Sequence, residues 1–192
     1  MFDVLFSHIL AKVPLTVAEQ EAIKPFFTPR KLRKKQYLLQ EGEVCQYLSF
    51  VSKGLLRSYS VDEKGGEHMN MFAFEGWWSS DMYSFFSGQK AVFAIDAIEP
   101  PEILMITLED FEAMTLKVPV MDRYFRLLFQ NSLMTKEQRL ISSVSDSAAE
   151  KYFRLAAGNP ELIQRIPQNL IASYLGIAPE TVSRIKKNQV SK

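Results

Sequence analysis

The segment from Gln168 to Lys187, QNLIASYLGIAPETVSRIKK, constrains the fold of this chain more than any other stretch. A helix-forming run ends at Gly176, which tolerates the positive φ of a sharp turn. Pro179 suits the start of a second helix, because its missing N–H would be unpaired there anyway. The apolar positions recur at helical spacing and can converge on one small core: Ile171, Leu175, Ile177, Val182 and Ile185. The pattern predicts a helix-turn-helix.

The second predicted helix carries a polar face opposite this core. Glu180, Ser183, Arg184 and Lys187 follow the spacing i, i+3, i+4 and i+7 and therefore share one side. Their donors and acceptors suit base edges and phosphates in a major groove. The alternative is a solvated face with an ion pair between Glu180 and Arg184, worth about 0.3–0.5 kcal/mol. Because the whole segment fits the pattern at once, we favour DNA reading.

Charge and cysteine content limit the class of protein. The net charge of the chain is only +1, but five cations and a single carboxylate lie between Arg165 and the end. This asymmetry predicts a basic end that meets a polyanion. One cysteine, Cys45, excludes a disulfide framework or a cluster held by several thiolates, and fits a reducing cytosol. Without a signal sequence or a membrane-length apolar run, we expect a cytoplasmic protein with no membrane partner.

Residues 37 to 106 show the sequence pattern of consecutive antiparallel strands. Glycines fall near the eight-to-twelve-residue rhythm of such strands, at positions 42, 54, 65, 66 and 76. Paired glycines in the segment 62–66 supply the positive φ of a hairpin turn. The predicted strands are 47–51, 55–59, 68–74, 92–98 and 103–107. Helical segments precede them in residues 1–27. The pattern predicts a barrel or jelly roll flanked by helices.

Catalytic chemistry has little support in this chain. A metal-dependent roll would need several clustered ligands, but the only histidines are His8, outside the predicted roll, and His68. No nucleophile–base pairing, phosphate-cradling loop or dinucleotide fingerprint is present. We therefore expect that the protein is not an enzyme and that it binds no metal ion and no cofactor.

A long helix is predicted from Pro119 to about Ser143. Seven of its residues follow the 4-3-4-3 interval of a coiled-coil seam: Val120, Tyr124, Leu127, Asn131, Met134, Gln138 and Ile141. The polar members Asn131 and Gln138 can set register and oligomer number. The spacing favours a homodimer, and the alternative is a helix buried within a monomer.

The predicted fold class is α+β with three parts. Residues 1–118 form the N-terminal helices and a sensing β-roll, residues 119–144 the long dimerisation helix, and residues 145–192 the helix-turn-helix part. Serines and Asp146 in the segment 142–147 can cap a new helix start and predict a hinge there.

This order of parts resembles the Crp/Fnr family of bacterial transcription regulators. The match is most specific at Gly176, in the run Glu180-Thr181-Val182 and at Arg184-Ile185. The resemblance implies a two-fold dimer on palindromic double-stranded DNA, with RNA polymerase as a further partner and a roll that binds an effector, usually a cyclic nucleotide. It places Glu180 and Arg184 on base edges and Thr181 and Lys187 on phosphates. The predicted DNA-binding set is Gln168, Glu180, Thr181, Ser183, Arg184 and Lys187.

The roll departs from the family's cyclic-nucleotide pattern. Binders carry Gly-Glu-Leu for the ribose and Arg-Ser or Arg-Thr for the phosphate, whereas Ser80-Asp81 and Ala91-Val92 stand at these places here. The nearest cation, Lys90, lacks the planar fork that grips phosphate. A buried phosphate without a matched cation is penalised, so we expect no tight binding of cyclic AMP or cyclic GMP. The candidate pocket for an unknown effector is Trp78, Ser80, Asp81, Lys90, Ala91 and Val92. Core filling is the alternative for the aromatic residues.

The end of the chain also departs from the family pattern. Many relatives follow the recognition helix with a β-hairpin wing, where this sequence has only Asn188 to Lys192. Ala178 replaces a serine that often caps the second helix. We expect fewer phosphate contacts as a result. The leading hypothesis is a dimeric DNA-binding regulator, and the alternative is a small-molecule sensor that acts by protein contact with a vestigial helix-turn-helix.

Overall fold

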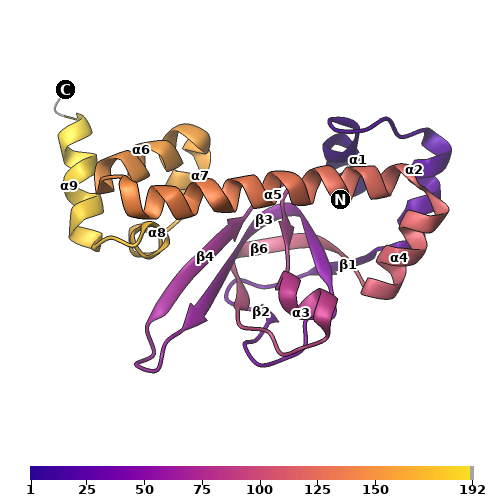
Figure 1. The fold of residues 1–192 in the computed structure, drawn as a ribbon, viewed down its shortest axis with the longest axis horizontal. Helices are drawn as coiled ribbons and strands as arrows, with labels where there is room; N and C mark the ends of the chain where they lie inside the picture. The colour runs from indigo at the N-terminus through magenta and orange to yellow at the C-terminus, as the bar shows by residue number, and fades with distance from the viewer. Residues whose placement is uncertain (191–192) are drawn as a thin grey trace. The chain divides into compact units, whose positions relative to one another are not determined.

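The computed structural model describes the backbone of residues 1–190 and the side chains of residues 1–188, and divides into two compact units (Figure 1). Unit 1 comprises Met1–Ser60 and Met71–Gln130. Unit 2 comprises Val61–Asn70 and the chain from Asn131 onward. This division falls inside the long helix and assigns a hairpin tip to unit 2, so it differs from the predicted boundaries after residues 118 and 144.

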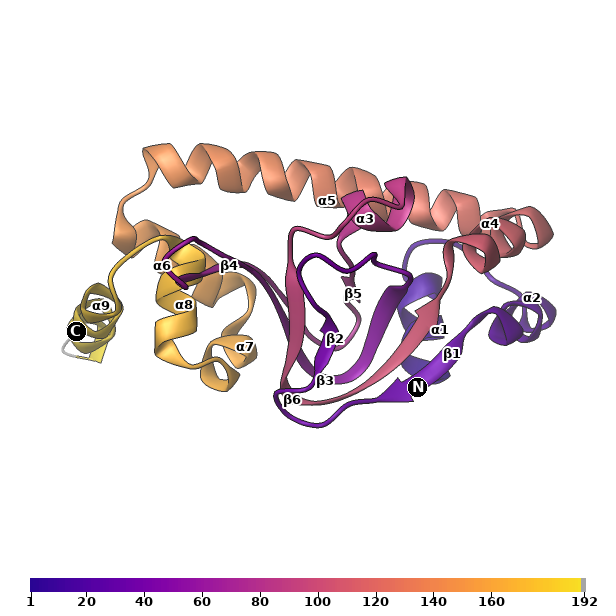
Figure 2. The ribbon, with the colours of Figure 1, turned by 90° about the horizontal axis from the view of Figure 1, so that it is seen from below.

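Two short helices open unit 1. Helix α1 (Phe2–Leu10) buries Leu5 and Ile9 completely, because these residues lie four apart on one face. Helix α2 (Val17–Ile23) begins with a capping box between Thr16 and Glu19, and a 3-10 turn, η1 (Lys24–Phe26), follows it. Figure 2 shows α2 at the same end of unit 1 as helix α4 (Leu108–Lys117).

An antiparallel sheet forms the body of the roll, as predicted. Its strands are β1 (Thr28–Lys31), β2 (Tyr37–Leu39), β3 (Leu48–Val61), β4 (Glu67–Ala73), β5 (Trp78–Ser79) and β6 (Ala94–Ile106). The order is β1-β6-β3-β4, with β2 paired to β6 and β5 paired to β3. The order places β6 and β3, the two longest strands, at the centre.

Each of these two long strands joins segments that the sequence predicts as separate strands. The register of β3 on β6 shifts between Val51 and Leu56, where β3 passes Pro100 and Pro101. Gly54 lies there with φ +87°, and a Cβ atom on it would approach the Pro100 carbonyl oxygen to 2.7 Å. Glycine therefore ends no strand at this position; it allows one strand to continue past the proline pair.

The two faces of β3 have different surroundings. Phe50 packs against Trp78, with ring centroids 5.2 Å apart, and Trp78 packs against Phe125 of α5 (Val120–Ser145) at 5.1 Å. Ser49 and Val51 face the opposite way, because side chains alternate along a strand. They are fully buried too, and the second face is therefore the interior of the roll.

Unit 2 is mainly helical. It contains the end of α5, α6 (Ala148–Gly158), α7 (Pro160–Arg165), α8 (Gln168–Leu175) and α9 (Pro179–Val190), which are grouped in Figure 1. Its buried apolar residues are Met69 of the hairpin and residues from α6 to α9 and their connectors: Tyr152, Leu162, Ile166, Ile171, Ala172, Val182 and Ile185. No helix within residues 1–190 is long and apolar enough to cross a membrane.

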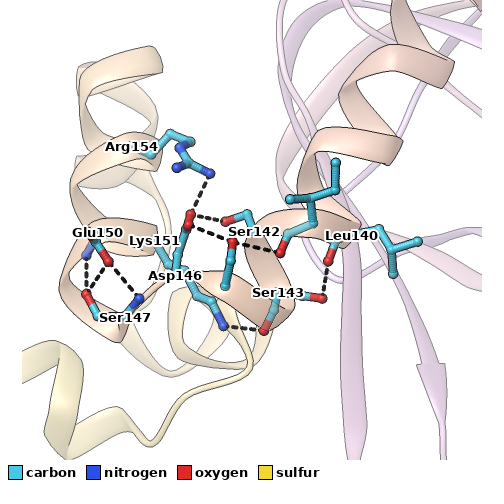
Figure 3. A network of polar contacts seen from close by, with 10 residues as sticks. Leu140, Ser142, Ser143, Asp146, Ser147, Glu150, Lys151 and Arg154 are labelled. Atoms are coloured by element: carbon cyan, nitrogen blue, oxygen red, sulfur yellow. Dashed lines mark hydrogen bonds and ion pairs between the residues drawn. The ribbon is translucent and has the colours of Figure 1, made fainter.

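Polar contacts hold the junction between α5 and α6 (Figure 3). The Asp146 carboxylate accepts a hydrogen bond from Ser142 Oγ at 2.5 Å and forms an ion pair with Arg154 at 2.7 Å. The hydrogen bond from Ser142 is the main cause that holds the pKa of Asp146 below its usual value. Ser147 and Glu150 form a capping box that starts α6. The predicted helix start in this segment is confirmed, and the hinge remains a prediction.

Candidate nucleic-acid interface

The turn between α8 and α9 is built as the sequence predicts. Gly176 adopts the left-handed conformation at φ +66°, and its N–H donates to the carbonyls of Ala172 and Ser173. The Ile177 N–H also donates to the Ala172 carbonyl, at 3.0 Å. These bonds satisfy carbonyls that the end of α8 leaves open. Helix α9 then begins at Pro179.

The core beneath this turn fixes the orientation of α9. Ile171 and Ala172 of α8 and Val182 and Ile185 of α9 are buried, while the predicted core residues Leu175 and Ile177 are half-buried. Burial of each large aliphatic side chain contributes about 1.5–3 kcal/mol. The opposite side of α9 is therefore held outward.

The outward side of α9 presents the predicted contact residues. Glu180, Arg184 and Lys187 are exposed, and Thr181 and Ser183 are half-buried. The side chains of Glu180 and Arg184 make no hydrogen bond or ion pair with any residue that the structure describes. The ion pair that the alternative interpretation required does not form, and both groups can bind a partner outside the chain.

Gln168 braces the two helices of the motif. Its Nε2 atom, at the start of α8, donates to the Pro179 carbonyl at the start of α9 over 3.1 Å. This bond ties the two helix starts together. In this arrangement the side chain positions the recognition helix.

A hairpin holds α8 from another side, through Ser173. The Ser173 hydroxyl accepts from the Met69 N–H at 3.1 Å and donates to the Glu67 carbonyl at 2.9 Å. Met69 and Glu67 belong to β4, in the part of the hairpin that lies in unit 2. One side chain thus satisfies two backbone groups of an edge strand.

Arg139 of α5 reinforces the same contact. Its guanidinium donates to the carbonyls of Met69 and Asn70 on β4 and, at 3.1 Å, to that of Tyr174 on α8. It also lies over the Tyr174 ring, 4.0 Å from the centroid. We name Ser173 and Arg139 the hairpin clamp. Sequence reasoning missed it, because every acceptor of Arg139 is a main-chain atom and carries no sequence signal.

Asp81, predicted to contact an effector, is instead bonded to the protein backbone. Its side chain is 1% exposed. One oxygen accepts from the Ser84 N–H at 3.0 Å and caps α3 (Met82–Ser87), while the other accepts from the N–H groups of Val92 and Phe93 at 2.9 and 3.2 Å. The carboxylate therefore links the start of α3 to the residues just before β6.

The other candidate pocket residues do not share one environment. Trp78 lies in the aromatic core, and its Nε1 atom donates to the Tyr124 hydroxyl at 2.9 Å. Ser80 Oγ donates to a backbone carbonyl at 3.3 Å. Ala91 is buried, whereas Lys90 and Val92 are exposed.

A cavity of about 500 Å³ borders these residues in unit 1, where its lining residue Cys45 contacts Ser80 at 3.3 Å, and sequence reasoning did not find it. Its lining includes none of the six predicted pocket residues. It consists of Arg30, Leu38, Leu39, Glu43, Val44, Cys45, Gln46, Tyr47, Ser49, Ser79 and Ile95. The available signal was a serine at an inward position of each of two apolar strands, Ser49 and Ser79.

The predicted dimer seam on α5 needs correction at Tyr124. This side chain is completely buried within unit 1, where its hydroxyl contacts His8 Nδ1 at 2.7 Å, so it cannot face a partner chain. Val120 and Leu127 are half-buried against the same core. The other four seam residues are exposed: Asn131, Met134, Gln138 and Ile141. The spacing of the seven residues correctly predicted a helix, but the first half of that helix packs on the sheet.

The second half of α5 has a broad exposed apolar strip. Its members are 52% to 87% exposed, and two pairs are separated by seven residues. They are Leu133, Met134, Leu140, Ile141 and Val144. Exposed residues of this size at a heptad interval are typical of a helix that pairs with another helix.

Comparison with known proteins adds family relationships. Residues 29–117 match the family described as cyclic nucleotide-binding domain. The chain is 25% identical to the regulatory protein HlyX of Actinobacillus pleuropneumoniae, over 90% of this chain and 77% of that protein. It is 24% identical to the fumarate and nitrate reduction regulatory protein of Vibrio cholerae, over 95% and 77%.

Solved structures support the fold. FixK2 from Bradyrhizobium japonicum superposes with a TM-score of 0.71 and 22% identity, over 86% of this chain and 85% of that chain. The c-di-GMP responsive global regulator CLP of Xanthomonas campestris superposes with a TM-score of 0.73 and 12% identity, over 92% and 93%. At these identities the likeness shows a shared architecture of roll and helices.

Proposed function

Because the chain belongs to the Crp/Fnr family of bacterial transcription regulators, we propose that it is a homodimeric, sequence-specific reader of double-stranded DNA. The relatives are regulators, and the protein is not an enzyme. We place it in the cytoplasm, where bacterial DNA lies, with RNA polymerase as a further partner.

The outward face of α9 carries this proposal. Arg184 is exposed without a partner among the described residues, and its guanidinium can donate two hydrogen bonds to a guanine edge. Glu180 lies one turn earlier and can accept from a cytosine amine. Thr181, Ser183 and Lys187 flank them and suit phosphate oxygens.

The exposed strip on α5 supports a dimer. An isolated chain would leave Leu133, Met134, Leu140, Ile141 and Val144 in water, whereas a second copy of the helix would cover them. A two-fold dimer reads a two-fold site, so we propose a palindromic operator.

The roll supports a signal other than a cyclic nucleotide. Asp81 stands where the family has its ribose-binding glutamate, and its two oxygens already accept three backbone N–H groups. Ala91 is buried without a charge, and the nearest cation, Lys90, is exposed. These residues do not fit a buried cyclic phosphate, which needs a matched cation.

Selection from random double-stranded DNA tests the proposal. We expect a palindromic motif to be enriched, with the same strength in the presence and absence of cyclic AMP or cyclic GMP. Arg184→Ala should cost about 1–3 kcal/mol of binding and relax specificity at one base pair of each half-site. Lys136→Ala removes one exposed cation from α5 and should leave the motif unchanged. Failure to enrich any motif would favour a sensor that acts by protein contact.

A further inference from the structure

The cavity in the interior of the roll contains two hydroxyl groups without partners. Ser49 of β3 and Ser79 of β5 are register partners, and each is 1% exposed. Neither Oγ atom has a hydrogen-bond partner among the described residues. Native proteins rarely bury such groups unpaired, because the hydroxyl loses its bonds to water and gains none in return. Both atoms line the cavity, where an incoming group can donate to them and accept from them.

An unpaired cation lines the same cavity. Arg30 of β1 is half-buried, and its side chain has no hydrogen bond or ion pair within the described part of the chain. The carboxylate in the lining, Glu43, is already engaged, because it accepts from the Gln40 N–H at 3.1 Å. Glu43 keeps its negative charge but is exposed to water, whereas Arg30 is half-buried, so the Arg30 guanidinium is the charged group of the lining that can pair with an anionic ligand group.

The remaining wall has an apolar part beside Gln46 and Tyr47. Leu39, Cys45 and Ile95 are 6%, 5% and 1% exposed, and Leu38 and Val44 extend the same surface. A volume of about 500 Å³ lies within the ordinary range for small-molecule sites. A ligand for this space combines an apolar body with polar groups that can reach Arg30 and the two serines.

We propose that the cavity binds a small organic monocarboxylate with an apolar chain and a second polar group, such as a hydroxy acid. The carboxylate pairs with the Arg30 guanidinium, and the chain lies along Leu39 and Ile95. The second polar group bonds to the hydroxyls of Ser49 and Ser79. This site is separate from Asp81 and from the face of α9, and the inference does not depend on DNA reading.

The test uses chemically matched probes with the full chain. Three series are titrated by calorimetry and by amide chemical shifts of the cavity residues: ω-hydroxy fatty acids from hexanoate to decanoate, the fatty acids without the hydroxyl, and the ω-hydroxy amides. We expect saturable binding of the hydroxy acids, with the amides and the plain acids each weaker by about tenfold.

Variants then assign each preference to its residues. Arg30→Gln should abolish the preference for acid over amide, and the double variant S49A/S79A should abolish the preference for hydroxy acid over plain acid. Lys31→Gln is the matched control, since Lys31 pairs with Glu102 and does not line the cavity. Each preference is a ratio measured on one protein, so a loss of stability does not imitate the expected result.

Two outcomes would overturn the inference. One is the absence of saturable binding in all three series, and the other is equal binding of acids and amides to the unaltered protein. Enrichment of a DNA motif alongside either failure would refute the cavity site and leave the proposed function standing.

Discussion

Acid should destabilise this protein through His8. The Trp78 indole donates to the Tyr124 hydroxyl oxygen at 2.9 Å, so the hydroxyl proton is left to donate to His8 Nδ1 at 2.7 Å. An Nδ1 atom that accepts a hydrogen bond belongs to a neutral imidazole. Burial, and then the charge of Lys12, lower the pKa of His8 from 6.5 to about 4.

The sign and size of the effect follow from these two pKa values. Between pH 6.5 and about 4 the unfolded state holds a proton on His8 that the folded state lacks. The free energy of unfolding therefore falls as the pH drops through this window and levels off below the folded pKa. From about pH 7 to about pH 5 the shift corresponds to a loss of about 2 kcal/mol. Partial solvation of the half-buried ring reduces the expected loss to between about 1 and 2 kcal/mol.

Urea denaturation at about pH 7, 6 and 5 measures this loss. Carboxyl groups with a lowered pKa, such as that of Asp146, titrate below this range and do not contribute to it. His8→Gln should remove most of the pH dependence, while His68→Gln, which alters an exposed ring on the hairpin, should preserve it. If the free energy of unfolding falls by the same amount with pH in His8→Gln and in the unaltered protein, the pH dependence does not arise from His8.

Two further predictions concern the dimer and the roll. Leu140→Glu places a charge in the exposed strip of α5 and should convert the proposed dimer into a monomer in analytical ultracentrifugation. The control Leu116→Glu changes an 83% exposed leucine of α4 and should leave the dimer intact. If the protein stays dimeric with either change, the interface lies elsewhere. Asp81→Asn should cost about 2 kcal/mol of unfolding free energy, because an amide has one acceptor oxygen for three backbone N–H groups. Glu112→Gln at an exposed carboxylate is its control, and equal stability of the two variants would show that the Asp81 bonds are dispensable.

The helix-turn-helix was predictable because its determinants are local. Gly176 and Pro179 restrict their own backbone, and the apolar residues of α8 and α9 lie within a few turns of one another. The face of α9 that remains exposed follows from the face that is buried. Nothing outside the segment was needed to place Glu180 and Arg184.

The roll was predictable as a class of fold and not in its contacts. The sequence predicts a turn at Gly54, because glycines commonly end strands. In the structure Gly54 instead gives room for Pro100, which lies far away in the sequence. The resemblance places Asp81 at a position that contacts the effector, yet its oxygens accept from the Ser84 N–H, as a local helix cap, and from the N–H groups of Val92 and Phe93 just before β6. The more distant partners of Gly54 and Asp81 carry no sequence pattern.

The predicted dimer seam on α5 was wrong at Tyr124 for a different reason. Over a few turns, the interval of a coiled coil and that of a helix packed on a sheet are nearly the same, so spacing alone cannot say what covers Tyr124. The aromatic residues that surround it, Trp78 and Phe125, decide this in favour of the roll. Farther along the helix Leu133 and Leu140 are 60% and 69% exposed, and they belong to the exposed strip.

The course of the chain gives two routes by which the roll and the DNA-reading helices can influence each other. Helix α5 continues from unit 1 into unit 2, and so do β3 and β4, whose hairpin end is bound by the clamp residues Ser173 and Arg139. Ser49 of the cavity lies on β3, the same strand that continues to that hairpin end. A ligand can shift the DNA-reading helices only if it interacts differently with two arrangements of these elements. The clamp bonds backbone atoms of β4 to α8, so any change in the path of β4 must break them or move α8 with it.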